Sequence, residues 1–361
     1  MSITLTADEE ASVAAFAERQ FMAALAAMEL ANVELGVRLH LYEALRAAPL
    51  SAPELASATG IAPRYAVEWL EQQAVARVVE VEDLSAPPDQ RRYVLPAAHA
   101  HCLIEDDSEA CVKPMSALVP WLSGAVTLMA EEFRSGTGLS FGAFDLHDIQ
   151  AAFTRPVFVH HLVQSWLPAL PEVQARLSAG EPLRIAEIGC GEGLAAITIA
   201  KAYPQVTIDG YDLDEASIAS ARKAGADAGV LDRVHFHQAD AGTVELSEPY
   251  DLVLSIEMLH DVPDPIAVLT TARRLAGSSG AVLVADERTK DALTIDDDPM
   301  ERFFYVFSTL HCLAVSLQDG GAGTGTVIRE STVRDYASRA GFSSVDVLDV
   351  DHPQFRLYQL G

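Results

Sequence analysis

Apolar residues recur at helical spacing in the N-terminal part of the chain. One stripe over residues 34–47 predicts a helix with a single buried face, and it consists of Leu35, Leu39, Tyr42 and Leu45. Ser51-Ala52-Pro53-Glu54 has the pattern of a capping box, so a second helix should begin there, and Pro63 should lie in the first turn of a third. Two short apolar runs follow over 78–81 and 92–95, with a polar segment between them. The pattern predicts a helix-turn-helix followed by a hairpin, as in a winged helix.

Short apolar runs alternate with helical segments in the second half of the chain. Seven of these runs predict strands, over residues 183–186, 206–211, 234–239, 250–255, 280–285, 344–350 and 355–360. Helices between the early runs predict parallel strands with crossover connections. The linker Asp351-His352-Pro353-Gln354 is too short for a crossover helix, so the last strand should return antiparallel to its predecessor. The expected fold is α/β, with a seven-stranded sheet whose last strand is reversed.

Composition and charge narrow the range of partners. The chain has 361 residues, half of them hydrophobic, and a formal net charge of −27. This charge disfavours nucleic acid and anionic membrane surfaces, because both would be repelled without a local basic patch. The N-terminal segment lacks a secretory signal pattern, residues 114–130 are uncharged but too short to span a bilayer, and the four cysteines show no paired spacing. We therefore expect a cytoplasmic protein with no membrane partner.

The residues Glu187-Ile188-Gly189-Cys190-Gly191-Glu192-Gly193 directly follow the first predicted strand. Glycine lacks a Cβ atom and tolerates positive φ, so such a turn lets a cofactor lie on the backbone. A dinucleotide fingerprint would need its third glycine one residue later, where the chain has Leu194. The motif resembles instead the first motif of the Rossmann-like S-adenosylmethionine-dependent methyltransferases. This resemblance implies that a loop faces the methionine part of the cofactor through Glu187, Gly189, Gly191 and Gly193.

The ends of the next three strands also resemble this family. Asp212 follows the second strand, where the resemblance implies contacts with both ribose hydroxyls. Asp240 follows the third strand and would accept a hydrogen bond from the adenine amino group. Helix capping or turn formation is the alternative role for both aspartates. The run 250–261 is similar to the fourth-strand motif of the same enzymes. The further cofactor contacts that the resemblance implies are therefore Asp212, Leu213, Asp240, Ala241 and Ser255.

A winged helix raises the question of DNA binding. The helix in the recognition position, residues 63–76, carries one arginine and two glutamates, and residues 1–100 contain seven basic and fourteen acidic residues. A DNA reader gains its non-specific affinity by neutralising phosphates, so we expect no nucleic-acid partner. The segment resembles the N-terminal dimerisation domain of small-molecule O-methyltransferases. This implies a homodimer in which the apolar helix over 10–32 packs on the partner chain.

Aromatic side chains are frequent between the wing and the sheet. The segment 109–177 has helical spacing, and a second aromatic group in the run 299–313 consists of Phe303, Phe304, Tyr305 and Phe307. In the resembled family both segments form the roof of the substrate pocket, which implies a flat, mostly apolar acceptor and a site without water. The expected organisation is a winged-helix dimerisation domain over residues 1–105, a helical substrate cap over 106–177 and the methyltransferase domain over 178–361.

His260 is the candidate general base. It precedes Asp261, and plant-type and related bacterial O-methyltransferases carry their catalytic histidine in a similar pair. The carboxylates that flank this histidine in the family would correspond to Glu287 and Glu330. The chain departs from the family at Val262, where tryptophan is usual. The alternative is that His260 is a structural residue of a turn.

Other candidate groups have simpler expected roles. A glycine-rich insertion over 318–326 is either a lid or a flexible turn. Three further histidines lie in segments that would face the acceptor, but core or surface roles are expected for them; they are His160, His161 and His311. Four residues match no zinc pattern, so no metal is expected there: His99, His101, Cys102 and Cys111.

The sequence therefore predicts a homodimeric S-adenosylmethionine-dependent methyltransferase of secondary metabolism. Its acceptor is expected to be a small aromatic or polyketide-like natural product, methylated on oxygen. Carbon or nitrogen methylation, for example of an indole or an amine, is the close alternative, because the cofactor motifs would be the same. A different class of function is a non-catalytic, S-adenosylmethionine-binding winged-helix regulator.

Overall fold

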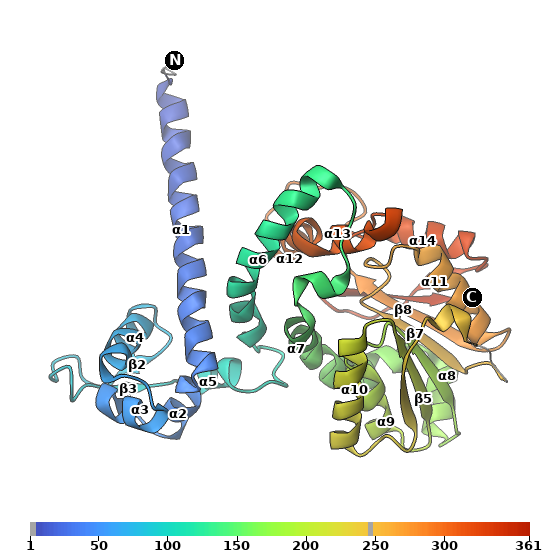
Figure 1. Cartoon of the computed structure of the whole chain (residues 1–361), viewed down its shortest axis with the longest axis horizontal. Coiled ribbons are helices and arrows are strands. Elements are labelled where there is room, and N and C mark those ends of the chain that lie inside the picture. Colours follow the sequence, from blue (N-terminus) through green and yellow to red (C-terminus); the bar gives the residue numbers. More distant parts are fainter. Residues whose placement is uncertain (1–4, 245–247) are drawn as a thin grey trace. The chain divides into compact units, whose positions relative to one another are not determined.

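Figure 1 shows the computed structural model, which describes residues 5–244 and 248–361. The chain divides into two units between Leu122 and Ser123. The N-terminal unit is mainly helical, whereas the C-terminal unit is built on a seven-stranded sheet. Within the described ranges, no helix combines the length and the apolar character that crossing a membrane requires.

The N-terminal unit has the predicted winged-helix pattern. Its elements are α1 (Ala7–Arg38), α2 (Leu41–Ala47), β1 (Leu50–Ser51), α3 (Ala52–Thr59), α4 (Pro63–Val75), β2 (Glu80–Val81), β3 (Arg92–Val94) and α5 (Ala97–Leu103). Strand β3 pairs antiparallel with β1 and with β2. Helix α3 begins at the predicted capping box, where the backbone N–H of Ser51 donates to Glu54 at 2.7 Å. The expected helix-turn-helix and wing are therefore confirmed.

The apolar stripe predicted over residues 34–47 does not belong to one helix. His40 adopts a left-handed backbone conformation with φ of 55° and separates α1 from α2. Tyr42 is buried and its hydroxyl donates to Gln73 at 2.6 Å, but Leu35 and Leu39 are exposed. The prediction of a single helix was wrong because the turn at His40 places the two halves of the stripe on different faces.

Helix α1 leaves a row of large apolar side chains in solvent. Figure 1 shows that its N-terminal portion extends beyond the other helices of its unit. Five of its side chains are more than half exposed: Val13, Phe16, Phe21, Met22 and Met28. An exposed apolar surface of this kind is typical of a protein-binding face.

The sheet of the C-terminal unit has the strand order β6-β5-β4-β7-β8-β10-β9. The strands are β4 (Arg184–Ile188), β5 (Thr207–Asp212), β6 (Val234–Gln238), β7 (Leu252–Ile256), β8 (Ala281–Glu287), β9 (Val345–Val347) and β10 (Phe355–Leu360). The strands from β6 to β8 are parallel, whereas β10 pairs antiparallel with both β8 and β9. The predicted seven-stranded sheet with a reversed last strand is therefore confirmed.

Helices bury both faces of this sheet. They include α8 (Pro171–Ser178), α9 (Leu194–Ala202), α10 (Glu215–Ala228), α11 (Pro265–Ala276) and α14 (Glu330–Arg339). Successive strand residues point to opposite faces, so Leu252 and Leu254 of β7 join the core with α9 and α10, while Val253 joins the core with α11 and α14. Burial on both faces explains why the central strands β7 and β8 are almost continuous apolar runs, whereas the edge strand β6 alternates between buried and exposed residues.

A helical segment precedes the sheet. It comprises α6 (Lys113–Ser135), the 3-10 helix η1 (Phe141–Phe144), α7 (His147–Val157), η2 (Phe158–Trp166) and η3 (Leu167–Ala169). A second helical run follows β8 and comprises α12 (Pro299–Phe307), η5 (Ser308–Cys312) and α13 (Leu313–Ser316). The two runs touch, because the backbone N–H of Leu139 donates to the carbonyl of Ala314 at 2.9 Å. This contact brings 139–158 and 313–318 to the same end of the sheet.

Candidate active site

A cavity of about 540 Å³ lies at the carboxyl ends of the parallel strands, in the C-terminal unit. Its wall is formed by the segments that follow β4, β5, β6 and β7, and by residues of η1, α7 and α13. Seven of the predicted cofactor residues line it: Glu187, Gly189, Gly191, Asp212, Leu213, Asp240 and Ala241. In an open α/β sheet this end of the strands is where ligands bind.

The glycine loop has three glycines with two different roles. Gly189 and Gly193 have φ of 70° and 76°, and a Cβ atom on either would collide with a neighbour, Met258 at 2.9 Å and Phe236 at 2.5 Å. Gly191, with φ of 49°, has nothing within 4 Å of the position of a Cβ atom. The outer glycines are therefore needed for packing, and Gly191 leaves free space for a ligand on the cavity wall.

Asp212 is held against the glycine loop. Its Oδ2 accepts from the backbone N–H of Gly191, and its Oδ1 accepts from that of Asp214, both at 2.9 Å. Burial raises the pKa of Asp212, and these N–H groups act in the opposite direction. Each carboxylate oxygen keeps a second lone pair for a vicinal diol, so the residue fits the ribose contact expected of it.

Asp240 and Ala241 lie at the start of the short 3-10 helix η4 (Ala241–Thr243). Oδ1 of Asp240 accepts from the backbone N–H of Gly242 at 2.7 Å. Arg274 of α11 donates to the carbonyls of Ala241 and Val244 at 2.8 Å and to that of Gly242 at 3.2 Å. No sequence pattern indicates Arg274, which fixes the loop that carries two predicted cofactor contacts.

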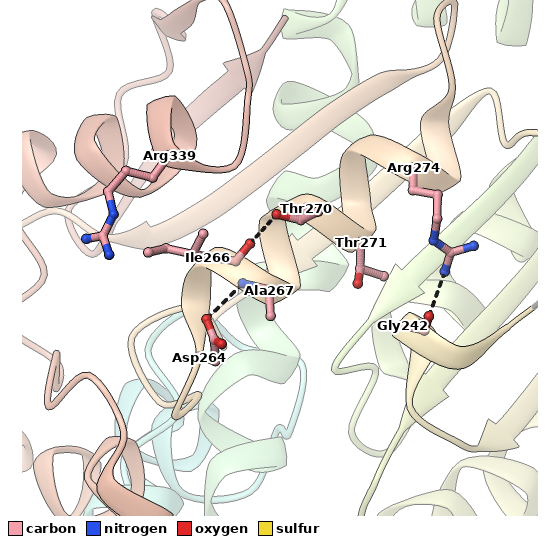
Figure 2. Close-up of a pocket in the computed structure, with 8 residues that line it drawn as sticks. All are labelled: Gly242, Asp264, Ile266, Ala267, Thr270, Thr271, Arg274 and Arg339. Carbon is pink, nitrogen blue, oxygen red and sulfur yellow. Dashed lines mark hydrogen bonds between the residues drawn. The ribbon is translucent and has the colours of Figure 1, made fainter.

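Figure 2 shows a second hollow, of about 590 Å³, on the side of this loop where Arg274 meets Gly242. Its polar groups are already engaged. Asp264 caps α11 by accepting from the N–H of Ala267 at 2.9 Å, and Thr270 donates to the carbonyl of Ile266 at 2.8 Å. We therefore consider the first cavity, rather than this hollow, as the candidate active site.

Two predicted cofactor residues do not line the cavity. Gly193 caps the start of α9, and Ser255 is buried inside β7.

Glu187 lines the cavity, and burial raises the pKa of its carboxyl to about 8, although a hydrogen bond from the backbone of Ala196 acts in the opposite direction. The structure therefore brings Glu187 to the cavity as a neutral carboxylic acid at neutral pH.

His260 is buried beneath the cavity wall within a group of carboxyls. Its Nδ1 lies 2.7 Å from Oδ1 of Asp286 and 2.9 Å from Oε2 of Glu287, and its Nε2 lies 3.3 Å from Oδ1 of Asp261. Burial opposes a charge on the ring, but Glu287, Asp261 and Asp286 outweigh it and raise the pKa of His260 well above its usual range. The three carboxyls therefore stabilise the protonated form of the ring, an imidazolium. Asp261 is the member of this group that lines the cavity.

Glu330 lies apart from this group. It begins α14, and its carboxylate accepts from Arg334 one turn later at 2.8 Å. The structure brings Glu287 to His260 as expected, but Asp286, which directly precedes Glu287, occupies the place expected of Glu330. Asp286 and Glu287 are the last two residues of β8, and both reach the ring of His260 on the loop after β7.

Aromatic and polar side chains of the helical segment also contribute to the cavity wall. Phe141, His147, Thr154 and Phe158 line it. His147 lies 3.1 Å from a carboxylate oxygen of Asp214, and this ion pair joins α7 to the loop after β5. The segment expected to cap the substrate thus contributes directly to the cavity.

The aromatic residues of α12 do not line the cavity. Phe303 and Phe307 pack on each other with ring centroids 4.7 Å apart, and Phe153 of α7 packs on Phe303 at 6.1 Å. Val315 and Gln318, just beyond the predicted run, line it instead. His311 is buried against Phe144, with ring centroids 4.6 Å apart, in agreement with the core role expected for it.

Comparison with known families agrees with both halves of the chain. Residues 181–315 match a methyltransferase domain, and residues 23–105 match an Rv2258c-like winged helix-turn-helix domain. The ubiquinone biosynthesis O-methyltransferase of Pseudomonas aeruginosa strain LESB58 is 28% identical over 178 residues, which are 49% of this chain and 72% of that protein. The enzyme of the same name from Bordetella bronchiseptica is 28% identical over 180 residues, 49% of this chain and 69% of that protein.

Solved structures share the fold over almost the whole length. The mitomycin 7-O-methyltransferase MmcR has a TM-score of 0.65 at 20% identity, covering 97% of this chain and 99% of that one. PigF with SAH gives 0.69 at 19% identity, covering 99% and 100%. Human N-acetylserotonin methyltransferase in complex with SAM gives 0.65 at 15% identity, covering 100% and 99%. At such identities the likeness is one of fold.

Proposed function

We propose that this S-adenosylmethionine-dependent methyltransferase with an N-terminal winged-helix domain methylates an oxygen atom of a small aromatic or polyketide-like acceptor. The observation that carries the proposal is a single cavity with two different walls. One wall consists of the glycine loop and Asp212, and the other includes Phe141 and Phe158. A flat acceptor between these walls would face the methyl-bearing end of the cofactor.

The chemistry places few demands on the protein beyond positioning. When bound, the cofactor supplies a methyl group already activated on a sulfonium, so the residues of the chain have to align the acceptor and exclude water. Alignment of this kind lowers a barrier by about 7–11 kcal/mol. The contact of 139–158 with 313–318 supports this role, because both segments contribute to the wall that would shield the acceptor.

The acceptor's hydroxyl proton needs a partner at the polar end of the cavity. Asp261 lines the cavity, and His260 lies directly behind it with Asp286 and Glu287 on its far side. We propose that Asp261 accepts a hydrogen bond from the hydroxyl and that His260 fixes Asp261. The prediction that His260 itself takes the hydroxyl proton as general base remains a hypothesis. It requires the ring first to lose its own proton, which the neighbouring carboxylates stabilise.

The test is a transfer assay with methyl-labelled cofactor against matched phenols, indoles and amines. Oxygen methylation predicts labelled ethers from the phenols only. Labelled indoles or amines would contradict oxygen as the target and support carbon or nitrogen methylation. Tight cofactor binding without transfer to any class would favour a non-catalytic regulator.

We also propose that the N-terminal unit joins two copies of the chain. The exposed apolar side chains of α1 support this, because they would be covered in a homodimer. The acidic composition of residues 1–100 disfavours DNA binding by this unit. Light scattering should give twice the mass of the chain, and removal of residues 1–100 should give a monomeric, aggregation-prone remainder. A monomeric full-length protein, or one that binds duplex DNA at physiological salt, would contradict the proposal.

A further inference from the structure

Glu257 has an unusual backbone conformation at the end of β7. Its φ of 52° lies in the left-handed region, which a residue with a side chain adopts only when its surroundings hold it there. The backbone N–H of Glu257 donates to the carbonyl of Ala285 at 2.8 Å, so the pairing of β7 with β8 continues up to the bend. The bend is thus fixed by the sheet, and Glu257 lines the cavity at that point.

The strand register places Glu257 beside the glycine loop. Ile188 of β4 pairs with Ser255 of β7, so the glycine loop and the residues after β7 leave the sheet at the same edge and side by side. Met258, the next residue, packs so closely on Gly189 that a Cβ atom there would lie 2.9 Å from its Cε. Glu257 therefore stands at the part of the cavity assigned to the methionine end of the cofactor.

The charges around this position are mostly negative. Seven lining residues carry a carboxyl group: Glu187, Glu192, Asp212, Asp214, Asp240, Glu257 and Asp261. His147 is the basic residue among the described lining residues, and it pairs with Asp214. Arginine and lysine are absent from that described lining. The cavity as a whole therefore favours a positively charged ligand.

The lining carboxyls differ in their bonding. Asp212 and Asp240 accept backbone N–H groups. Glu187 accepts from the backbone of Ala196, but its Oε2, like Oδ1 of Asp261, is shielded from solvent and has no donor among the described residues. Oε2 of Glu257 is shielded from solvent and has no hydrogen-bond donor among the described residues. A buried polar oxygen without a donor is costly unless a ligand or a proton compensates it.

The charged groups near Glu257 come from two neighbouring elements. His260 and Asp261 lie on the loop after β7, and Asp286 lies at the end of β8. Burial raises the pKa of Glu257 to about 8, against the charge of His260. Without a ligand the carboxyl therefore carries a proton at neutral pH.

We propose that Glu257 makes the site selective for S-adenosylmethionine over the product S-adenosylhomocysteine, by losing its proton to solvent when the sulfonium binds. The inference rests on the proposed cofactor site. The two ligands share their adenosine and amino-acid parts, and they differ by one methyl group and the positive charge on sulfur. A carboxylate formed beside the sulfonium attracts the substrate form of the cofactor, and it gains nothing from the uncharged product. The same residue therefore favours release of the product.

Linkage gives the sign of the pH dependence. If binding lowers the pKa of Glu257 from about 8, affinity for S-adenosylmethionine rises with pH up to that value, by roughly tenfold per pH unit below it. S-adenosylhomocysteine lacks the sulfonium, so its affinity should lack this component. Both ligands carry the same amino group and present the same parts to the other carboxyls of the cavity. Titration of these groups therefore changes both affinities equally and cancels in their ratio.

The experiment is calorimetry of the full-length protein with each ligand near pH 7, in two buffers of different ionisation enthalpy. The wild type should release close to one proton more with S-adenosylmethionine than with S-adenosylhomocysteine. Glu257→Gln should abolish this difference and lower the affinity ratio of the two ligands by about tenfold. Glu301→Gln is the matched control, because Glu301 is a buried glutamate of the same unit that does not line the cavity.

Three results would overturn the inference. The first is equal proton release with both ligands in the wild type. This measurement needs no variant, so the test stands even if a variant fails to fold. An affinity ratio unchanged in a folded Glu257→Gln protein, or lowered equally in Glu301→Gln, would also contradict it. Absence of heat with either ligand in the wild type is a different outcome, since it would remove the cofactor site itself and the proposed function with it.

Discussion

Nδ1 of His260 lies 2.7 Å from Oδ1 of Asp286, and both side chains are buried. Oε2 of Glu287 lies 2.9 Å from the same nitrogen, but the hydrogen bond of Nδ1 goes to Asp286. The pKa values of the two carboxyls move apart. Burial raises the pKa of Glu287 well above its usual range, whereas for Asp286 the charge of His260 outweighs burial and lowers it. Asp286 is therefore the carboxyl whose ionised form His260 stabilises most, whereas burial favours the neutral form of Glu287.

This difference between the two carboxyls predicts unequal effects of two isosteric substitutions. Asp286→Asn removes the counter-charge of a buried imidazolium and should lower the free energy of unfolding by about 3–5 kcal/mol. Glu287→Gln replaces a carboxyl whose neutral form burial favours and should cost less than about 1.5 kcal/mol. Urea denaturation near pH 7 measures both. Equal losses would mean that the negative charge is shared by the two carboxyls.

His260→Ala should lower turnover of a phenolic acceptor by roughly 10²–10⁴-fold and leave cofactor affinity nearly unchanged. The pH profile separates the two possible roles of the ring. A general base with a raised pKa acts only as the pH rises past that value, so the wild-type rate should then increase in the alkaline range. If His260 only positions Asp261, the pH dependence of the rate should instead follow ionisation of the phenol, with a pKa of about 10, in both the wild type and the alanine variant. Near-normal turnover of the alanine variant would exclude both roles.

Much of the fold could be predicted because it depends on local patterns. The glycine turn after β4 and the capping box at Ser51 are written in consecutive residues, and both are where the sequence predicts them. The short linker 351–354 forces the reversed last strand for a geometric reason. The break at His40 escaped prediction because histidine, although enriched among non-glycine residues with left-handed backbone, adopts it too rarely for its presence to indicate a turn.

The site was predictable only in part. Residues at strand ends fall together in any parallel sheet, which explains why Asp212 and Asp240 reach one cavity. Whether Asp286 or Glu330 meets His260 depends on how β8 and α14 pack, and neither sequence position indicates that. Glu257 was visible only as part of a motif, because its left-handed backbone has no local sequence signal.

Gly191→Val should abolish S-adenosylmethionine binding while the fold persists. The position has φ of 49° and open space where a Cβ atom would lie, so the new side chain would occupy the room left for the ligand and strain the loop. Calorimetry measures the loss. Asp212→Ala should weaken binding less, because water replaces part of the ribose contacts. Undiminished affinity of the valine variant would show that the loop does not meet the cofactor.

Arg274→Met should weaken cofactor binding through the loop that Arg274 holds. Three carbonyls of residues 241–244 would lose a charged donor, and a charge-assisted hydrogen bond contributes about 1.5–3 kcal/mol. We expect roughly tenfold lower affinity for S-adenosylmethionine by calorimetry, which corresponds to about 1.4 kcal/mol and so to no more than one such bond. Arg339→Met is the control, because Arg339 borders the same hollow but pairs only with the exposed Asp335 in the described structure (Figure 2). Equal effects of the two variants would indicate a general loss of positive charge.

Glu257→Gly should make the protein more stable while it loses its preference for the charged cofactor. Glycine adopts left-handed backbone without the strain of about 1–2 kcal/mol that other residues pay there, although it adds chain entropy to the unfolded state. The pH dependence carries the sharper signal. The folded pKa of Glu257, about 8, lies above the unfolded value of about 4.3, so its contribution to stability is complete below the unfolded pKa and is lost as pH rises through the folded one. The gain of the variant over wild type should therefore grow between about pH 4 and pH 8 and then level off, as followed by urea denaturation. A gain that is constant with pH would mean that only the strain is relieved and that Glu257 is ionised in the free protein, and the selectivity proposed for it would then have no proton to release.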